Sequence, residues 1–241
     1  MISTQYNDFK YENLGNGIEI CISNEHRFGT DAFLLADFAS PRHKDSVCDL
    51  CSGSGIIALL MIRNFKPAYV SAVEIQQKAA EQIRLARGIE GLCKFEVFEA
   101  DLKEWKSESE LDLITCNPPY KINNTGIKNK QDAVTIARHE ILCDINDVCE
   151  CAARNLKFGG RLCICNRPER LCDTMDAMRK NGVEPKRLRM VQKMPTSPPW
   201  LFLIEGKKGS KPYMDIEAPL YTTDGNGNYS DEMKRIYRLQ D

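Results

Sequence analysis

Short apolar runs alternate with helical patterns along this chain, and this alternation constrains the fold more than any other feature. The apolar runs lie at 46–50, 69–75, 93–101, 111–116 and 161–165, and helix-like segments lie at 56–65, 76–88 and 144–160. Strands that alternate with helices form βαβ units with parallel strands. Residues 111–116 are apolar on both faces, as a central parallel strand requires. The pattern predicts an α/β fold with a doubly wound, mostly parallel sheet.

The flanking segments complete this prediction. Asp144 is expected to cap the helix 144–160, and Gly159-Gly160 to close it; Gly88 is expected to close the helix 76–88. A helix over 168–182 precedes two strands, 186–192 and 200–208, which bring antiparallel character to the end of the sheet. We expect one domain over 1–241, with an N-terminal extension (1–46), a core (47–206) and a turn-rich tail (207–241) that ends in a short helix.

Composition favours a cytoplasmic protein. The first residues show no basic stretch followed by an apolar run, and no apolar stretch approaches the ~18 residues that span a bilayer. The 11 cysteines are an odd number and are scattered through core-like segments, which argues against a disulfide framework. A zinc site at Cys48-x-x-Cys51 and Cys163-x-Cys165 is the alternative, but buried thiols are the simpler interpretation. We expect no metal and a monomer.

Charge is distributed unevenly along the chain. The net charge is −1, yet residues 1–150 carry 16 Lys and Arg against 23 Asp and Glu, whereas residues 151–241 carry 17 against 11. The basic excess is strongest within 151–211, with 14 basic and 5 acidic residues. A solvated surface explains such a bias as well as a polyanionic partner does on charge alone.

Polar residues follow four successive strands at the edge where an open parallel sheet binds ligands. The first strand leads into the glycine turn Asp49 to Gly55, which allows close backbone approach. Glu74 follows the second strand and could accept hydrogen bonds from both hydroxyls of a ribose. Asp101 follows the third strand and could accept from an exocyclic amino group. This order predicts a cofactor that contains a nucleoside.

The fourth strand ends at Asn117-Pro118-Pro119-Tyr120, which could be a simple strand stop. A planar amino group lends its lone pair to a π-system and is a poor nucleophile. The Asn117 Oδ1 and the Pro118 carbonyl could both accept its N–H bonds and turn the lone pair toward an electrophile. Tyr120 offers a stacking face. An amino group held in this way can attack the electrophile first and lose its proton afterwards, so no general base is needed before the attack.

These motifs resemble the class I S-adenosylmethionine-dependent methyltransferases, which have a Rossmann-like seven-stranded sheet with helices on both faces and an antiparallel final strand. The glycine turn is similar to the family's D/E-x-G-x-G-x-G, with Cys51 in place of the first glycine. NPPY is similar to the motif of amino-group methyltransferases. The segments RFGTDAFLLADFA, DLCSGSG, NPPY, GGRL and DGNGNYSDEM follow the layout of bacterial adenine-N6-methyltransferases that modify valine tRNA beside the anticodon.

The resemblance implies S-adenosylmethionine as cofactor and RNA, most simply tRNA, as partner. The implied cofactor residues are Gly29, Thr30, Asp49, Cys51, Ser52, Gly53, Glu74, Ile75, Asp101, Leu102 and Asn117. The implied catalytic residues are Asn117, Pro118, Pro119 and Tyr120. The residues expected to bind the substrate are Tyr120, Lys121, Lys186, Arg187 and Arg189.

Three alternatives share these features. Protein glutamine methyltransferases use the same NPPY, although the ~46 residues before the first strand are too few for the separate N-terminal domain they commonly carry. Guanine-N2 methylation of ribosomal RNA fits the motif as well. A non-catalytic RNA-binding protein on the same fold would not need Glu74, Asp101 and NPPY together.

Overall fold

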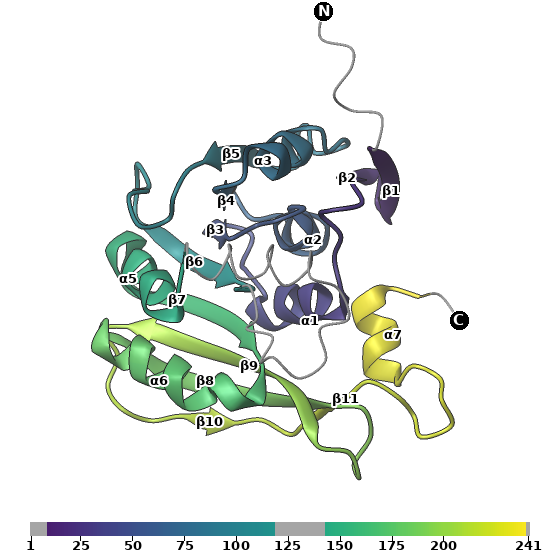
Figure 1. Cartoon of the computed structure of the whole chain (residues 1–241), viewed down its shortest axis with the longest axis vertical. Helices are drawn as coiled ribbons and strands as arrows, with labels where there is room; N and C mark the ends of the chain where they lie inside the picture. Colours follow the sequence, from purple (N-terminus) through teal and green to yellow (C-terminus); the bar gives the residue numbers. More distant parts are fainter. Residues whose placement is uncertain (1–8, 119–142, 240–241) are drawn as a thin grey trace, which may run out of the picture.

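A computed structural model describes residues 9–118 and 143–239 (Figure 1). Its main sheet has the strand order β10-β8-β9-β7-β6-β3-β4-β5, and β11 also pairs with β8. The strands are β3 Ser46–Leu50, β4 Tyr69–Glu74, β5 Lys94–Glu99, β6 Leu111–Cys116, β7 Leu156–Asn166, β8 Val183–Gln192, β9 Pro199–Lys208, β10 Asp215–Ile216 and β11 Leu220–Tyr221.

The directions of the strands confirm the mostly parallel sheet. β6, β3, β4 and β5 run parallel to their neighbours, and β7 is parallel to β6. β9 lies between β7 and β8 and is antiparallel to both. The seven predicted strands are present, and the two-residue strands β10 and β11 extend the sheet at the β8 edge.

Helices cover both faces of the sheet (Figure 1). One apolar cluster joins α1 (Thr30–Ala39), α2 (Ile56–Phe65) and the Ile83 side chain of α3 (Gln77–Arg84) to one face. A second cluster joins α5 (Ile145–Asn155) and α6 (Leu171–Lys180) to the other face. Burying a Leu or Ile side chain contributes about 1.5–3 kcal/mol, so these two clusters are the main source of stability. A short 3₁₀ helix, Pro168–Arg170, precedes α6.

The boundary between α5 and β7 differs from the prediction. Asp144 caps α5 as expected, in a capping box with Asp147. The helix ends at Asn155, however, and not at Gly159-Gly160. Leu156 is fully buried and already pairs with Leu111 of β6, so the chain turns directly from helix into strand. The two glycines lie at the register shift between this pair and the next one, Leu113 with Arg161.

The prediction that Gly88 closes α3 is also wrong, because α3 ends at Arg84. The residues after it pair with a hairpin that the sequence analysis did not predict, β1 (Lys10–Gly15) and β2 (Ile18–Ile22). Arg87 forms a β-bridge with Glu19 of β2. A Cβ on Gly88 would lie 1.9 Å from the Gly17 carbonyl oxygen, so glycine is required where the two segments meet.

The tail packs back on the sheet. β10 and β11 pair with β8, and α7 (Asp231–Tyr237) lies beside α1 (Figure 1). Met233 and Ile236 of α7 join the apolar cluster of α1 and α2. Within the described residues, no helix has the length and apolar character needed to cross a membrane.

Candidate functional site

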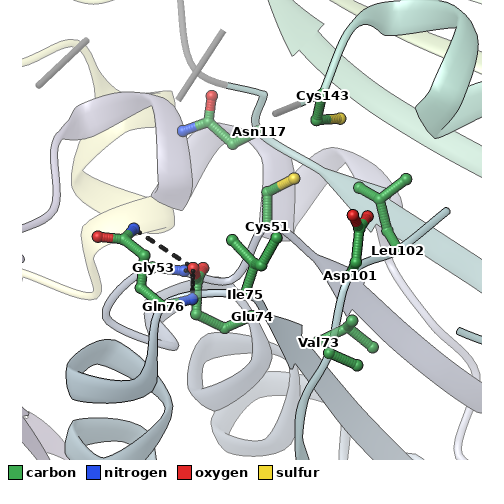
Figure 2. A pocket seen from close by; sticks show the side chains of 11 residues that line it. Cys51, Gly53, Val73, Glu74, Ile75, Gln76, Asp101, Leu102, Asn117 and Cys143 are labelled. Atoms are coloured by element: carbon green, nitrogen blue, oxygen red, sulfur yellow. Dashed lines mark hydrogen bonds between the residues drawn. The ribbon is translucent and has the colours of Figure 1, made fainter. Parts of the chain in front are cut away.

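A cavity lies at the carboxyl ends of β3, β4, β5 and β6, where the sequence predicts a cofactor site (Figure 2). Most of the residues that line it lie at the end of one of these strands or just after it. The lining residues are Cys51, Gly53, Val73, Glu74, Ile75, Gln76, Ala100, Asp101, Leu102, Asn117 and Cys143.

Glu74 is the most tightly held carboxylate of the cavity. Its side chain is only 4% exposed. Oε2 accepts the backbone N–H of Gly53 at 2.8 Å, and Oε1 accepts the backbone and side-chain N–H groups of Gln76 at 2.9 and 3.3 Å. Figure 2 shows these bonds converging on the carboxylate. Glu74 therefore ties the glycine turn to the end of β4 and presents acceptor oxygens at the cavity.

Asp101 and Leu102 line the cavity from the segment after β5. Asp101 Oδ1 accepts the backbone N–H of Lys103 at 2.9 Å, which orients the carboxylate. The Arg154 guanidinium of α5 donates to the carbonyls of Leu102 and Lys103 at 2.8 and 3.0 Å, which fixes this segment. Ile75 and Leu102 add apolar surface beside the two carboxylates.

Asp49 and Ser52 are buried beneath the glycine turn and do not line the cavity. Asp49 is fully buried; Oδ1 accepts from the Thr115 hydroxyl at 2.7 Å and Oδ2 from the Ser52 hydroxyl at 2.9 Å. Burial raises the pKa of Asp49 from 3.8 to about 7, against the lowering effect of these hydroxyls. The Asp49 carboxyl therefore keeps its proton to a higher pH in the folded state than in the unfolded state. As a result, the contribution of Asp49 to the free energy of unfolding falls as pH rises from about 4 to about 7.

Cys51 occupies a strained position in the same turn. Its φ is +54°, in the left-handed region that disfavours a Cβ by roughly 1–2 kcal/mol. The glycine motif that this turn resembles has glycine at this position, and the positive φ explains that preference, since glycine adopts it without a steric cost. The Cys51 side chain lines the cavity with that of Cys143, a residue that the sequence analysis did not propose (Figure 2).

The amide of Asn117 is held by two side chains from distant parts of the chain. Its Nδ2 donates to Asp31 Oδ2 at 2.9 Å, and its Oδ1 accepts from the Cys165 thiol at 3.1 Å. A carboxylate accepts only from the NH₂ end of an amide. Asp31 therefore sets the orientation in which Oδ1 is the acceptor. Asp31 and Cys165 are further site residues that sequence reasoning missed, although Asp31 lies within the quoted segment RFGTDAF.

Gly29 and Thr30 lie at the N-terminus of α1 and do not line the cavity. A Cβ on Gly29 would lie 2.7 Å from Asp31 Oδ1, so the glycine leaves room for the carboxylate that holds Asn117. The Thr30 hydroxyl shares a 2.7 Å hydrogen bond with that of Tyr237 in α7. Gly29 thus acts on the site through Asp31.

The remaining predicted residues fall into two groups. Pro118 follows Asn117 and is buried, whereas Pro119, Tyr120 and Lys121 lie outside the described residues. Lys186, Arg187 and Arg189 lie on β8.

The two β8 arginines are held in internal ion pairs. Arg187 contacts Glu205 and Glu217, each at 3.1 Å, and donates to the Phe38 carbonyl at 2.7 Å. Arg189 holds both oxygens of Glu232, at 2.7 and 2.9 Å. Lys186 donates to the Lys211 carbonyl at 3.2 Å. Ion pairs with carboxylates compensate the charge of both arginines.

The cysteines show no metal-binding arrangement in the part of the chain that the structure describes. All of those described are free thiols, and no three Cys, His, Asp or Glu side chains converge there as metal ligands. Burial raises the pKa of Cys93 to about 11 and that of Cys149 to about 12, so these thiols stay protonated near neutral pH.

Residues 24–181 match the family model of the methyltransferase small domain, which spans well over half of the chain and includes all of the cavity. The chain belongs to this family. The match begins before α1 and includes Asp31, Glu74, Asp101 and Asn117.

Curated relatives carry the name tRNA1(Val) (adenine(37)-N6)-methyltransferase. The one from Glaesserella parasuis is 32% identical over 106 residues, 44% of this chain and 45% of that protein. The one from Pedobacter heparinus is 31% identical over 136 residues, 56% of this chain and 57% of that protein. These matches thus span about half of each relative. The Porphyromonas gingivalis protein is 26% identical over 225 residues, 87% of this chain and 86% of that protein.

A solved structure supports the fold. The predicted O-methyltransferase Atu636 from Agrobacterium tumefaciens superimposes with a TM-score of 0.67 at 19% identity, covering 87% of this chain and 96% of that chain. The Rossmann-like methyltransferase fold expected from the sequence is confirmed.

Proposed function

We propose that this protein transfers a methyl group from S-adenosylmethionine to the exocyclic N6 amino group of an adenine in tRNA, beside the anticodon. The observation that carries this proposal is the Asn117 amide, which Asp31 and Cys165 orient at the edge of the cavity. The names of the curated relatives support the choice of acceptor.

The residues of the cavity fit S-adenosylmethionine. Glu74 and Asp101 follow neighbouring strands and supply acceptors for ribose hydroxyls and for an adenine amino group. Ile75 and Leu102 supply the apolar surface on which a purine packs. When bound, the cofactor supplies an electrophilic methyl group on a sulfonium.

Asn117 and Pro118 would act on the amino group of the acceptor. The Asn117 Oδ1 and the Pro118 carbonyl would each accept a hydrogen bond from one N–H of the amino group, so that the nitrogen lone pair is withdrawn from the π-system of the base and becomes nucleophilic. Pro118 has no N–H that could compete as a donor. The proton leaves after methyl transfer, so the step needs no general base. Tyr120 is proposed to stack on the base.

The alternative acceptors fit the chain less well. Glutamine in a protein and guanine N2 in ribosomal RNA both present a planar amino group, but the relatives named above specify adenine in tRNA. A non-catalytic protein would have no need of the Asn117 orientation. The β8 residues Lys186, Arg187 and Arg189 remain predicted phosphate contacts, and the ion pairs of the two arginines favour a structural role. The monomeric state, the cytoplasmic location and the lack of a metal also remain predictions.

Nucleoside mass spectrometry tests the acceptor. Total tRNA from a strain that lacks the gene is incubated with the purified protein and S-adenosylmethionine, then digested. We expect N6-methyladenosine to appear in valine tRNA, and far less to appear in the same time with Asn117→Ala. Methylation of guanine or of a protein glutamine, with none of adenine, would refute the proposed acceptor.

A further inference from the structure

A second concave surface lies where α7 meets α1, α2 and the β1–β2 hairpin. Two adjoining hollows share Leu14, Arg63, Tyr237 and Leu239, and so form one groove. We call it the α7 groove and define it by Phe28, Phe33, Arg63, Tyr229, Tyr237 and Arg238. The α7 groove shares no lining residue with the cavity and has no part in the proposed reaction.

Four aromatic rings form a connected row in the α7 groove. The ring centroids of Phe28 and Phe33 are 6.0 Å apart, those of Phe33 and Tyr237 are 4.8 Å apart, and those of Tyr237 and Tyr229 are 5.2 Å apart. Tyr229, at the end of the row, is 48% exposed. Exposed aromatic rings in a groove are the surface on which unpaired nucleic-acid bases stack.

Arg63 brings an uncompensated positive charge to the same groove. Its side chain is only 4% exposed, and it donates to the Leu14 carbonyl and to Asn64 Oδ1. Its Nη2 is buried and has no hydrogen-bond partner among the residues that the structure describes. Burial, with the nearby charge of Arg238, lowers the pKa of Arg63 to about 10. A buried guanidinium without a carboxylate is costly, and an anion would offset that cost.

Arg238, at the end of α7, is a second cation of the groove, and it is exposed. Among the described residues, neither Arg238 nor Arg63 forms a salt bridge. The other cations of α7 are compensated: Lys234 pairs with Asp231 at 3.3 Å, and Arg235 holds both oxygens of Asp37 at 2.8 Å. Of the four cations that line the groove, Arg63 and Arg238 are therefore the two without a salt bridge among the described residues, and Glu12 lines the groove as well.

The α7 groove is linked to the methyl-transfer site through α1. Tyr237 hydrogen-bonds Thr30, and the next residue, Asp31, holds Asn117. Figure 1 shows α7 beside α1. The groove and the amide of Asn117 thus meet adjacent residues at the start of α1.

We propose that the α7 groove binds single-stranded RNA next to the target adenine, with a base stacked on Tyr229 and Tyr237 and a phosphate held by Arg63 and Arg238. This inference rests on the proposed function. Aromatic rings stack on the base of a nucleotide, and guanidinium groups bind its phosphate, so the groove offers a contact for each of these two parts. A free anion would use the arginines alone.

Binding of a labelled anticodon stem-loop of valine tRNA tests this proposal, by fluorescence anisotropy at several salt concentrations. Arg238→Ala should weaken binding about fivefold and lower the slope of log K against log[salt] by about 0.7, the value for one phosphate contact on a single strand. Tyr229→Ala should weaken binding about tenfold, as loss of one stacked base does, with the slope unchanged. Tyr229→Phe should keep most of the affinity.

Arg42→Ala is the matched control, because Arg42 is exposed and follows the opposite end of α1 from Thr30. Within 9–118 and 143–239 its side chain forms no hydrogen bond or salt bridge. Calorimetry should give unchanged cofactor affinity for all four variants. If the Arg238 and Tyr229 variants bind RNA as tightly as Arg42→Ala does, and the wild type methylates tRNA, then the proposal for the α7 groove is wrong and the proposed function stands.

Two other outcomes separate the groove from the proposed function. A wild type that methylates no tRNA, but whose RNA affinity still falls with Arg238→Ala, would refute the acceptor and support the groove. Arg238→Ala that loses affinity for inorganic phosphate, with RNA affinity unchanged, would assign the arginines to a free anion and refute the groove.

Discussion

Glu74 and Asn117 lie on the same cavity but are held in place by different kinds of partner. Glu74 accepts from two backbone N–H groups, of Gly53 and of its near neighbour Gln76, at 2.8 and 2.9 Å, and from the Gln76 side chain only at 3.3 Å. Asn117 is held by two side chains, Asp31 from α1 and Cys165 from β7, which are 86 and 48 residues away in the sequence. The carboxylate thus depends on the path of the backbone, whereas the amide depends on two particular side chains.

This difference has a consequence for substitutions. Backbone donors persist when a neighbouring side chain changes, so the Glu74 position should tolerate changes around it. The Asn117 orientation should fail when Asp31 changes.

Asn117→Ala removes the acceptor for the target N–H and should have the largest effect. We expect kcat to fall by about 10²–10³, the loss seen when one preorganised polar group at a reacting centre is removed. Cofactor affinity should stay nearly unchanged. Single-turnover methylation and calorimetry measure the two quantities, and undiminished turnover would contradict the proposed hold on the amine.

Glu74→Ala should act on the cofactor. Hydrogen bonds to a charged group contribute about 1.5–3 kcal/mol each, so loss of the ribose contact should weaken S-adenosylmethionine binding by roughly 10–100-fold. The measurement is calorimetric titration. Equal affinity in the variant and the wild type would refute the ribose role of Glu74.

Asp31→Ala should lower kcat about tenfold through Asn117, since the amide loses the partner that fixes its rotation. Cofactor affinity should change little, which separates this positioning role from a general loss of structure. Asp37→Ala is the matched control on the same helix, because Asp37 pairs with Arg235 and not with Asn117. If the two variants lose activity equally, Asp31 has no positioning role.

Substitutions at Cys51 should have the smallest effect. Gly and Ala both remove the thiol, but only Gly relieves the left-handed backbone at φ +54°. We expect Cys51→Gly to be more stable than Cys51→Ala by about 1 kcal/mol in urea unfolding. An Ala variant as stable as the Gly variant would show that the turn carries no strain.

The same contrast explains what could be predicted from the sequence. The order of strand ends is a local pattern, so the placement of Glu74, Asp101 and Asn117 along one edge followed from it. The link between Asp31 and Asn117 could not be read in this way, because it forms only when α1 packs against the sheet. The end of α5 was misplaced for a similar reason: the burial of Leu156 against β6 overrides the helix-closing preference of Gly159.

The basic segment teaches the same lesson. Its charge count was correct, but a count does not show which cations meet carboxylates. Arg187 and Arg189 meet Glu205 of β9, Glu217 and Glu232, partners that the sheet and the tail bring together. Arg63 and Arg238, which lie outside that basic segment, form no salt bridge among the described residues.

The position of β9 between β7 and β8 also sets the order in which the molecule can be completed during synthesis. β7 is made before residue 167, but the partner on its open edge, β9, begins only at Pro199. α1, among the first helices made, packs against both strands and against α7. A ribosome-bound chain therefore holds an unpaired sheet edge and a half-covered first helix until its last third emerges. That interval is when aggregation or chaperone capture competes with folding.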